Sequence, residues 1–422
     1  MQKSSSRSLG RITTTTIGVI FVLLCIQNVT LRRTSVHELS TANNKLTTKV
    51  TKKTQNDIII PTTMKQSNKV DSTMNSNNNK MSAKEFLKFK IEPKQFEIYN
   101  HPFPCIRTSK SSNDEDATGF QYIKVYKTAS STVAHIVKYI ANKRGRCTEH
   151  SNHAAAHEFP SLSTRKTNDP KSFLFTFVRE PTKRGISDFF FTRVSQMGRE
   201  VNITNFKEGC CRPKLKLNGL AGFQLAYIST EERMPQSTFW NSTDPTMIQH
   251  PNLLKDRVNN VFHSYDFIGV SDRLNESLVA LSFILHLKLT EIIHVNYRTS
   301  GSFMPEGKTC IKLAKSVLTP DIEKYLETDE WKAITAGDKL LFNTANEALD
   351  NTIDNVIGRN KFKQRLEQYD SLMSLIKECD VICASACSSN GEYTEPTSCL
   401  PCMNEKRKQW YNEQKRKLLI ST

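Results

Sequence analysis

The stretch FQYIKVYKTASST at residues 120–132 decides the fold of this chain. Residues 120–126 are aromatic and β-branched, which predicts a β-strand. A helical pattern over 131–142 follows directly, so residues 127–132 form the turn between strand and helix. Such a turn directs backbone N–H groups and the positive end of the helix dipole at one point. The stretch therefore predicts a βα unit with an anion site at its turn.

Lysine and hydroxyl side chains give this turn its chemistry. Lys127 supplies a point charge, and Ser130, Ser131 and Thr132 supply donors to phosphate-type oxygens. In a nucleotide-triphosphatase P-loop, which reads G-x-x-x-x-G-K-[ST], the lysine closes the loop. Here both glycines are missing and the lysine opens the loop, which disfavours a kinase or an ATPase. The plainer alternative is an ordinary helix start capped by a serine.

A second predicted strand is also followed by a turn with basic and hydroxyl side chains. Residues 172–178 (SFLFTFV) are a continuous apolar run, which predicts a buried strand, and 179–187 (REPTKRGIS) follow it. Arg179 would stand at the carboxyl end of this strand, where open α/β sheets bind ligands. Ser187 would reach the same anion from two turns into the next helix, and an arginine with a serine makes a forked phosphate clamp. The alternative is a solvated arginine at a strand end.

The rest of the pattern predicts the fold class. Further strands are expected at 261–270 and 291–297. Helical patterns cover 185–194, 275–286, 320–327 and 339–357. Strands that alternate with helices predict an α/β fold with a P-loop-like, mainly parallel central sheet and helices on both faces.

The N-terminus predicts the compartment. Residues 12–31 are twenty consecutive uncharged positions, long enough to cross a bilayer, with arginines on both sides. The run ends without a small-residue cleavage site, which favours an uncleaved signal anchor over a cleaved signal peptide. We expect a cytoplasmic tail at 1–11 and a flexible stem at 32–95, rich in Thr, Asn, Ser and Lys. The single folded domain beyond the stem would then lie in the secretory lumen, where the sequons at Asn202, Asn241 and Asn275 would be accessible to glycosylation.

Charge and cysteine content agree with this organisation. The net charge is +17, but the excess lies mainly in 1–33, 34–95 and 403–422, and 96–402 is nearly neutral. A nucleic-acid-binding domain carries such an excess on its folded face, so we expect no nucleic-acid partner. Apart from Cys25 in the anchor, the cysteines are even in number, which suits disulfides in an oxidising lumen.

The C-terminal segment is rich in cysteine and basic residues. The spacing of its cysteines does not fit a zinc finger, so disulfides are favoured over a metal site for Cys379, Cys383, Cys387, Cys399 and Cys402. The adjacent Cys210 and Cys211 are expected to bond elsewhere in the chain. Residues 406–417 (KRKQWYNEQKRK) would attract a sulfated or carboxylated polymer, with a solvated helix as the default interpretation.

Together, the two turns resemble a known family. Lys-Thr-x-Ser-Ser-Thr at 127–132 is similar to the 5′-phosphosulfate loop of the sulfotransferases, and Arg-x-Pro-x-x-Arg-x-x-Ser at 179–187 is similar to their 3′-phosphate motif. Residues 189–193, 265–281 and 329–349 resemble the uronyl/heparan 2-O- and galactose 3-O-sulfotransferase branch, whose Golgi members are type II membrane proteins with a stem. The resemblance implies a sulfotransferase domain over 96–378, within which the similarity spans about 119–357, and a C-terminal extension over 379–422.

The resemblance also implies an activity. Such enzymes transfer a sulfuryl group from 3′-phosphoadenosine 5′-phosphosulfate (PAPS) to a hydroxyl of a glycan or polysaccharide in the Golgi lumen, without a metal. Lys127 would stabilise the departing phosphate. The residues that the resemblance assigns to PAPS are Lys127, Thr128, Ala129, Ser130, Ser131, Thr132, Arg179, Ser187, Arg298 and Thr299.

The general base and the acceptor stay open. The family carries a histidine base between its two motifs, and a histidine near pKa 6.5 suits that lumen. His157 has the better spacing to Arg179, His153 has the better local pattern, and Glu158 is an alternative to both. Incidental histidines on a surface helix are the competing interpretation, and a metal site is disfavoured because no matching Cys or Asp set is present. Rival functions are a protein-tyrosine or other acceptor sulfotransferase and a catalytically inactive lumenal glycan-binding protein; the oligomeric state is undetermined.

Overall fold

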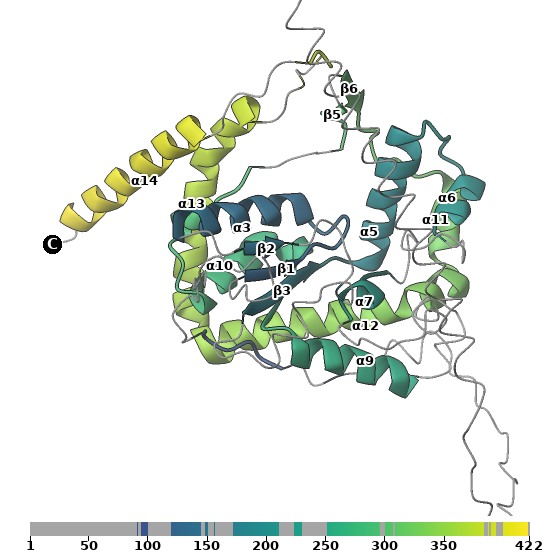
Figure 1. Ribbon diagram of the computed structural model, residues 1–422, viewed down its shortest axis with the longest axis horizontal. Helices are drawn as coiled ribbons and strands as arrows, with labels where there is room; N and C mark the ends of the chain where they lie inside the picture. The colour runs from purple at the N-terminus through teal and green to yellow at the C-terminus, as the bar shows by residue number, and fades with distance from the viewer. Residues whose placement is uncertain are drawn as a thin grey trace, which may run out of the picture. The chain divides into compact units, whose positions relative to one another are not determined.

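A parallel β-sheet organises the computed structural model (Figure 1). In the part of the chain that the structure describes, the sheet has four strands in the order β2–β1–β3–β4. Both neighbours of β1, and both neighbours of β3, run parallel to it. The strands are β1 (Phe120–Ile123), β2 (Thr148–His150), β3 (Phe173–Val178) and β4 (Phe267–Val270).

The described residues all belong to one unit, 78–422. They are 91, 94–99, 120–144, 148–150, 156, 172–210, 223–229, 251–295, 300–306, 309–383, 387, 390–393 and 400–420.

Aromatic side chains pair across the strands, and this explains why β1 and β3 read as buried in the sequence. Tyr122 lies opposite Phe175, and their rings stack with centroids 5.0 Å apart. Phe177 lies opposite Gly269 of β4, and its ring occupies the space where a Cβ at Gly269 would be, 2.5 Å away. Cross-strand pairs of this kind stabilise a sheet, and they set the register of β3 against both neighbours.

Helices cover both faces of the sheet, as predicted (Figure 1). Helix α3 packs on β1 and β2, whereas α10 and α12 pack on β4. The helices are α3 (Ser130–Arg144), α5 (Pro181–Asp188), α6 (Ile203–Cys210), α7 (Phe223–Ile228), α9 (Pro251–Ser264), α10 (Leu274–Ile284), α11 (Pro320–Leu326), α12 (Asp329–Asn351), α13 (Arg359–Cys383) and α14 (Leu400–Ile420). Two π-helices, η3 (Phe189–Gln196) and η8 (Thr352–Ile357), continue α5 and α12, and short 3-10 turns form η6 (Ser271–Arg273) and η7 (Leu289–Glu291).

Two predicted strands need correction. Residues 261–264 are the end of α9, and only Phe267–Val270 of the predicted 261–270 is a strand. The strand expected at 291–297 is wrong over its described part, because Glu291 ends η7 and 292–295 is irregular. Both stretches are rich in buried apolar residues, and a short buried apolar run looks the same in a helix, a loop or a strand.

The predicted helices are confirmed with shifted ends. The helix expected over 339–357 begins at Asp329, where the Thr328 side chain caps it by accepting a hydrogen bond from the Trp331 N–H group. The helix expected over 185–194 begins at Pro181, a residue suited to the first turn, and continues as η3.

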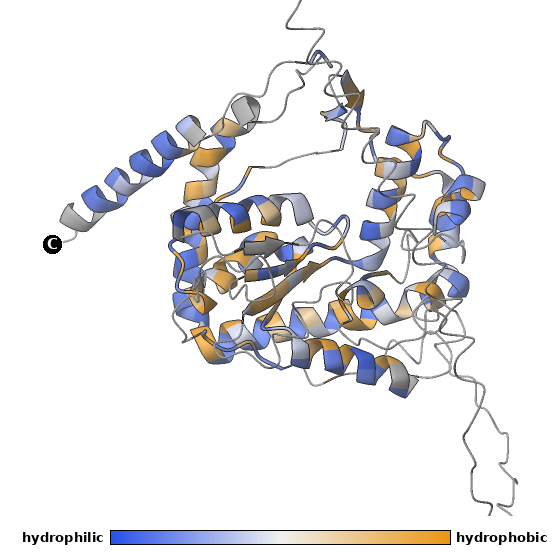
Figure 2. Cartoon of the chain, viewed as in Figure 1, coloured by the Kyte–Doolittle hydropathy of each residue, from blue (hydrophilic) through white to orange (hydrophobic). Residues whose placement is uncertain are grey.

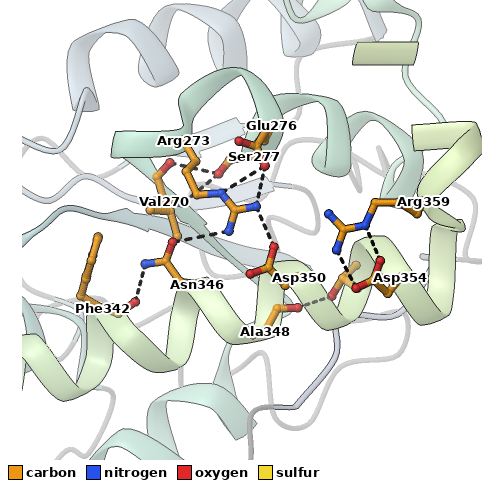
Figure 3. Close-up of polar contacts among 11 residues, drawn as sticks. Val270, Arg273, Glu276, Ser277, Phe342, Asn346, Ala348, Asp350, Asp354 and Arg359 are labelled. Carbon is orange, nitrogen blue, oxygen red and sulfur yellow. Dashed lines mark hydrogen bonds and ion pairs between the residues drawn. The ribbon is translucent and has the colours of Figure 1, made fainter. Parts of the chain in front are cut away.

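An ionic network joins η6, α10 and α12 behind β4 (Figure 3). The Arg273 guanidinium donates to Glu276 and, at 2.8 Å, to Asp350. The Ser277 hydroxyl accepts from the Val270 N–H group at 2.9 Å, which fixes the end of β4 to α10. The contacts of Arg273 with Asn346 and Asp350 connect segments more than seventy residues apart, and they are structural because they pair a part-buried guanidinium with polar and acidic groups of α12.

Disulfides fix the C-terminal segment, as its cysteine content predicted. Cys379 in α13 bonds to Cys402 in α14, and Cys387 bonds to Cys310. Cys310 lies in the antiparallel hairpin of β5 (Phe303–Glu306) and β6 (Thr309–Lys312). The predicted boundary between 378 and 379 falls inside α13, so the tail packs as a continuation of the fold.

The predicted anchor at 12–31 and most of the predicted stem at 32–95 lie outside the described residues. The predicted end of the stem is wrong at Ile91, because this side chain is buried in the hydrophobic core. Within the described residues, no helix is both long and apolar enough to cross a membrane.

His294 makes the stability of the fold dependent on pH. Its ring lies 3.1 Å from the Tyr369 hydroxyl, and burial lowers its pKa to about 4. The unfolded chain therefore binds this proton from about pH 6.5 downward, while the folded chain stays neutral. We expect the free energy of unfolding to fall by about 3 kcal/mol between pH 6.5 and pH 4 because of this residue.

Urea unfolding at several pH values would measure this effect. His294→Gln should flatten the pH dependence, whereas the same change at the exposed His263 should leave it as in the parent. Equal slopes for His294→Gln and the parent would contradict the assignment.

Candidate functional site

The loop between β1 and α3 has an unusual backbone. Lys127 has φ 63° and Ala129 has φ 58°, both in the left-handed region that favours glycine. Thr128 between them is fully buried, and its hydroxyl donates to the Val125 carbonyl at 3.1 Å. Alternating signs of φ are typical of loops whose backbone N–H groups converge on an anion. Each strained residue costs on the order of 1 kcal/mol, so the surrounding packing must hold the loop.

Helix α3 opens directly onto this loop. Its first helical hydrogen bond runs from the Val133 N–H group to the Ala129 carbonyl, at 3.1 Å. The backbone N–H groups of Ser130, Ser131 and Thr132 therefore have no acceptor within the helix. Ser130 and Thr132 are mostly buried, and Ser131 is half-buried. The loop thus presents backbone donors and hydroxyls at the start of α3, and their binding of an anion stays a prediction.

Arg179 lies beside the loop, at the end of β3. Its Nη1 atom donates to the Lys127 carbonyl at 3.2 Å, which joins the two predicted motifs directly. Within the described residues, the other guanidinium N–H groups have no acceptor, although burial lowers the pKa of Arg179. A half-buried guanidinium with free donors beside a convergent loop suits a phosphate-type ligand.

The strand order makes this edge of the sheet a switch point. From β1 the chain passes to β2 on one side, and then to β3 on the other. Ligands of open α/β sheets bind outside the carboxyl ends of strands where the order reverses in this way. Lys127 follows β1 and Arg179 follows β3, so both residues stand at the place where the topology leaves a crevice between connections.

A buried glutamine fixes the backbone of Arg179. The Gln224 side chain accepts from the Arg179 N–H group and donates to the Arg179 carbonyl, both at 2.8 Å. The Asp338 carboxylate in turn accepts from the backbone N–H groups of Gln224 (3.0 Å) and Leu225 (2.9 Å) at the start of α7. Asp338 thereby fixes the start of α7, and Gln224 at that start fixes the backbone of Arg179.

A fully buried arginine completes this support. Arg184 in α5 interacts with Asp188 at 3.8 Å, with the Phe223 ring at 5.0 Å and electrostatically with Asp338. Burial raises the pKa of Asp338, while Arg184 and the two backbone N–H groups oppose that shift. The buried charges on α5 and α12 therefore stabilise each other beneath the Arg179 segment.

An aromatic residue holds the lysine. The Lys127 Nζ atom lies over the Phe191 ring, 3.9 Å from its centroid. Phe191 belongs to η3, whose neighbours Phe189 and Phe190 are buried in an aromatic cluster. That cluster consists of Phe189, Phe190, Phe206, Ile322, Tyr325, Trp331 and Ile334. A π-helix is rare and is frequently found at functional sites, and here it presents Phe191 to the loop.

Not every predicted site residue can be placed. Ser187 lies in α5, half-buried, and its hydroxyl makes no hydrogen bond with any described residue. The predicted bases His153 and His157, their alternative Glu158, and the predicted donor residues Arg298 and Thr299 lie outside the described residues. In the part of the chain that is described, no group of His, Cys, Asp and Glu side chains is arranged to hold a metal ion.

Sequence reasoning missed the supporting residues. Gln224 and Asp338 lie 45 and 159 positions from Arg179. Gln224 belongs to no motif, and Asp338 lies within 329–349, whose resemblance to the family gave no role to this residue. Arg184 lies within 179–187 and Phe191 within 189–193. Residue spacing did not show that Arg184 is buried or that the Phe191 ring lies under the Lys127 ammonium. Of these four residues, only Gln224 lies outside every stretch that the sequence analysis singled out.

We expect Gln224→Leu to destabilise the protein and loosen Arg179. The change leaves the part-buried Arg179 N–H group and carbonyl without their Gln224 partners, which costs about 1–3 kcal/mol. Urea unfolding would measure this loss, with Gln364→Leu on the exposed face of α13 as the control. A free energy of unfolding that falls no more than that of the control would contradict this role for Gln224.

Comparison with known proteins places this chain in a family. The profile described as "Sulfotransferase family" matches residues 111–326, slightly more than half of the chain. The matched range contains the β1–α3 loop, Arg179, Gln224 and Phe191. A comparison with curated protein sequences gave no match. From the extent of the profile match, the chain belongs to the sulfotransferase family.

Proposed function

We propose that this sulfotransferase uses PAPS to sulfate a hydroxyl of a glycan or polysaccharide in the Golgi lumen. The observation that carries the proposal is the junction of the β1–α3 loop with Arg179, where the Arg179 Nη1 atom and the Lys127 carbonyl are 3.2 Å apart. Two anion-binding elements this close suit a ligand that carries more than one phosphate group.

The residues at the junction fit the two ends of PAPS. The backbone N–H groups and hydroxyls of Ser130, Ser131 and Thr132 would hold its 5′-phosphosulfate. Arg179, with its free donors, and Ser187 would bind its 3′-phosphate. Arg298 and Thr299 are proposed to close the nucleotide side. The strained loop supports this assignment, because backbone strain at Lys127 and Ala129 persists where a site is preorganised.

The reaction follows from these roles. The acceptor oxygen forms a bond to sulfur while the bond from sulfur to the phosphate oxygen breaks, and that electron pair stays on the departing phosphate. Lys127 would stabilise this developing charge, and Phe191 holds its ammonium at the loop. The acceptor proton passes to a general base, for which His157, His153 or Glu158 is proposed. Positioning and charge stabilisation supply the catalysis, as in phosphoryl transfer.

The proposed location rests on the N-terminal pattern. Residues 12–31 would anchor the protein as a type II membrane protein, and the stem would hold the domain in the lumen. Disulfides Cys379–Cys402 and Cys310–Cys387 support an oxidising compartment, because such bonds are rare in reducing ones.

Binding of 3′-phosphoadenosine 5′-phosphate, the desulfated donor, tests the cofactor. We expect Arg179→Ala to weaken this binding by about 10- to 100-fold, since hydrogen bonds to charged groups are lost. Lys127→Ala should lower kcat with PAPS by about 10²- to 10³-fold. Lys324→Ala on α11 is a control that removes a remote exposed charge. No binding at millimolar ligand by the folded parent would overturn the proposal.

Separate variants test the base. Removing a general base should lower kcat by about 10²- to 10⁴-fold without changing the affinity for 3′-phosphoadenosine 5′-phosphate. His157→Ala and His153→Ala would be compared in sulfate transfer to a panel of desulfated glycans and a tyrosine peptide. If both keep full turnover, neither histidine is the base, and transfer to the peptide alone would reject the glycan acceptor.

A further inference from the structure

One serine joins η3 to the segment that follows the β5–β6 hairpin, and the proposed chemistry does not use it. The half-buried Ser195 hydroxyl donates to the Phe190 carbonyl at 2.6 Å and accepts from the Ala314 N–H group at 2.9 Å. Phe190 lies in η3, whereas Ala314 comes two residues after β6. The hydroxyl therefore connects the π-helix to a segment more than one hundred residues away.

The bond within η3 bears on the form of that helix. A π-helix pairs residues that are five apart, whereas an α-helix pairs residues that are four apart. Ser195 and Phe190 are five apart, so the hydroxyl adds a bond between two residues at the spacing of the π form. A return to α-helical pairing would rotate the residues before Ser195 about the helix axis, and Phe191 is one of them.

Phe191 is the residue for which such a rotation matters. Its ring lies under the Lys127 ammonium, with 3.9 Å between Nζ and the ring centroid. The preceding Phe189 and Phe190 are buried in the aromatic cluster. Figure 2 shows hydrophobic and hydrophilic stretches along the ribbon of α5 and η3, which fits a helix with one face in that cluster. The direction of the Phe191 ring thus depends on the hydrogen bonding of η3 as well as on the packing of its neighbours.

The β5–β6 hairpin is itself fixed at two points. Cys310 in β6 forms a disulfide with Cys387. The Phe303 ring of β5 packs against Gly391, where an added Cβ would lie 2.6 Å from the ring. Figure 1 shows the hairpin close to the end of the helix that α5 and η3 form. The hairpin therefore offers η3 a partner whose position is set by the C-terminal segment.

Ala314 connects the hairpin to η3. Its carbonyl accepts from the Ser300 hydroxyl at 3.2 Å, and its N–H group donates to Ser195. Its side chain packs against the aromatic cluster that contains Phe189 and Phe190. Both the backbone and the side chain of Ala314 therefore restrain the π-helix.

We propose that Ser195 is a positioning residue for Lys127, which acts through η3 and Phe191 and takes its own position from the β5–β6 hairpin. The inference rests on the proposed function for the role of Lys127 in transfer. The hydroxyl holds the π form, the π form directs the Phe191 ring, and the ring places the ammonium at the β1–α3 loop. The hydrogen bonds of Ser195 go to neither the loop nor Arg179, so its loss should change transfer more than donor affinity.

The first test is the kinetics of sulfate transfer. Ser195→Ala should lower kcat with PAPS by about 10- to 100-fold, because a catalytic group that is slightly misplaced loses rate steeply. Its affinity for 3′-phosphoadenosine 5′-phosphate should match the parent, and Ser195→Thr, which keeps the hydroxyl, should restore turnover. Ser374→Ala is the matched control, since it removes a remote hydroxyl that donates to the Asp370 carbonyl at 2.9 Å. Parent-like kcat in Ser195→Ala would overturn the proposal.

A double-mutant cycle tests the route through Phe191. Phe191→Leu alone should lower kcat as Ser195→Ala does. Because both residues act on Lys127 along one path, the double variant should be no slower than the slower single variant. Losses that multiply in the double variant would mean that Ser195 acts elsewhere, and the proposal would be wrong. Urea unfolding of each variant checks that it is folded under the assay conditions.

The accessibility of the Lys127 ammonium gives a readout that does not need turnover. Acetic anhydride acetylates lysines, and mass spectrometry measures the rate at Lys127 against the exposed Lys324 as an internal reference. Ser195→Ala should raise the relative rate at Lys127 by about two- to fivefold, the factor that corresponds to a cation–π contact of ordinary strength. An unchanged relative rate would contradict the link between Ser195 and Lys127.

Paired disulfide variants test the part of the hairpin. Replacing Cys310 and Cys387 by serine should lower kcat in the parent, but should add nothing to the loss in Ser195→Ala. Replacing Cys379 and Cys402 by serine removes the other disulfide, between α13 and α14, and should leave kcat unchanged. Equal losses in the two disulfide variants would contradict the link through the hairpin.

The outcomes distinguish this inference from the proposed function. If Lys127→Ala keeps full turnover, the role of Lys127 in transfer is wrong, while a raised acetylation rate in Ser195→Ala would still support the positioning of its ammonium. If Lys127→Ala loses turnover and Ser195→Ala does not, the proposed function stands and the role of Ser195 is rejected.

Discussion

The parallel pairing of β1 with β3 is the constraint on which the candidate site depends. Their register runs from Phe120 opposite Phe173 to Ile123 opposite Thr176, and the buried Thr176 hydroxyl donates to the Ile123 carbonyl at 2.8 Å. Because parallel strands end at the same edge, this pairing forces the β1–α3 loop and Arg179 together. The bond between Arg179 and the Lys127 carbonyl follows from it.

A strained loop at this edge must be held by its surroundings. Lys127 and Ala129 adopt left-handed φ values, and contacts with Val125, Phe191 and Arg179 keep the loop in place. The restraints come from the segment that follows β1, from the π-helix η3 and from the end of the neighbouring strand β3. Such a loop arrives at its ligand already ordered, so binding does not have to supply the ordering free energy.

The accuracy of sequence reasoning followed the strength of the local signal. The strands around Phe120 and Phe173 and the helices after them were predicted, since their apolar runs and helix starts are long and continuous. Strand β2 was missed because Thr148–His150 consists of three polar residues. The strand predicted near Ile292 was wrong because a buried apolar run in an irregular segment has the same sequence pattern as a buried strand. Gln224 and Asp338 were missed because hydrogen bonds between remote segments have no period.

The sequence by itself determined the kind of chemistry: a basic, hydroxyl-rich turn after one buried strand and an arginine after another. Residue type and position relative to a strand end are local properties, so they can be read without a fold. The tertiary structure decided that the two turns meet at a switch point, because that depends on β2 lying on the far side of β1. It also decided which charges are buried and which, like those of α14, face solvent, because burial depends on segments that meet only after folding.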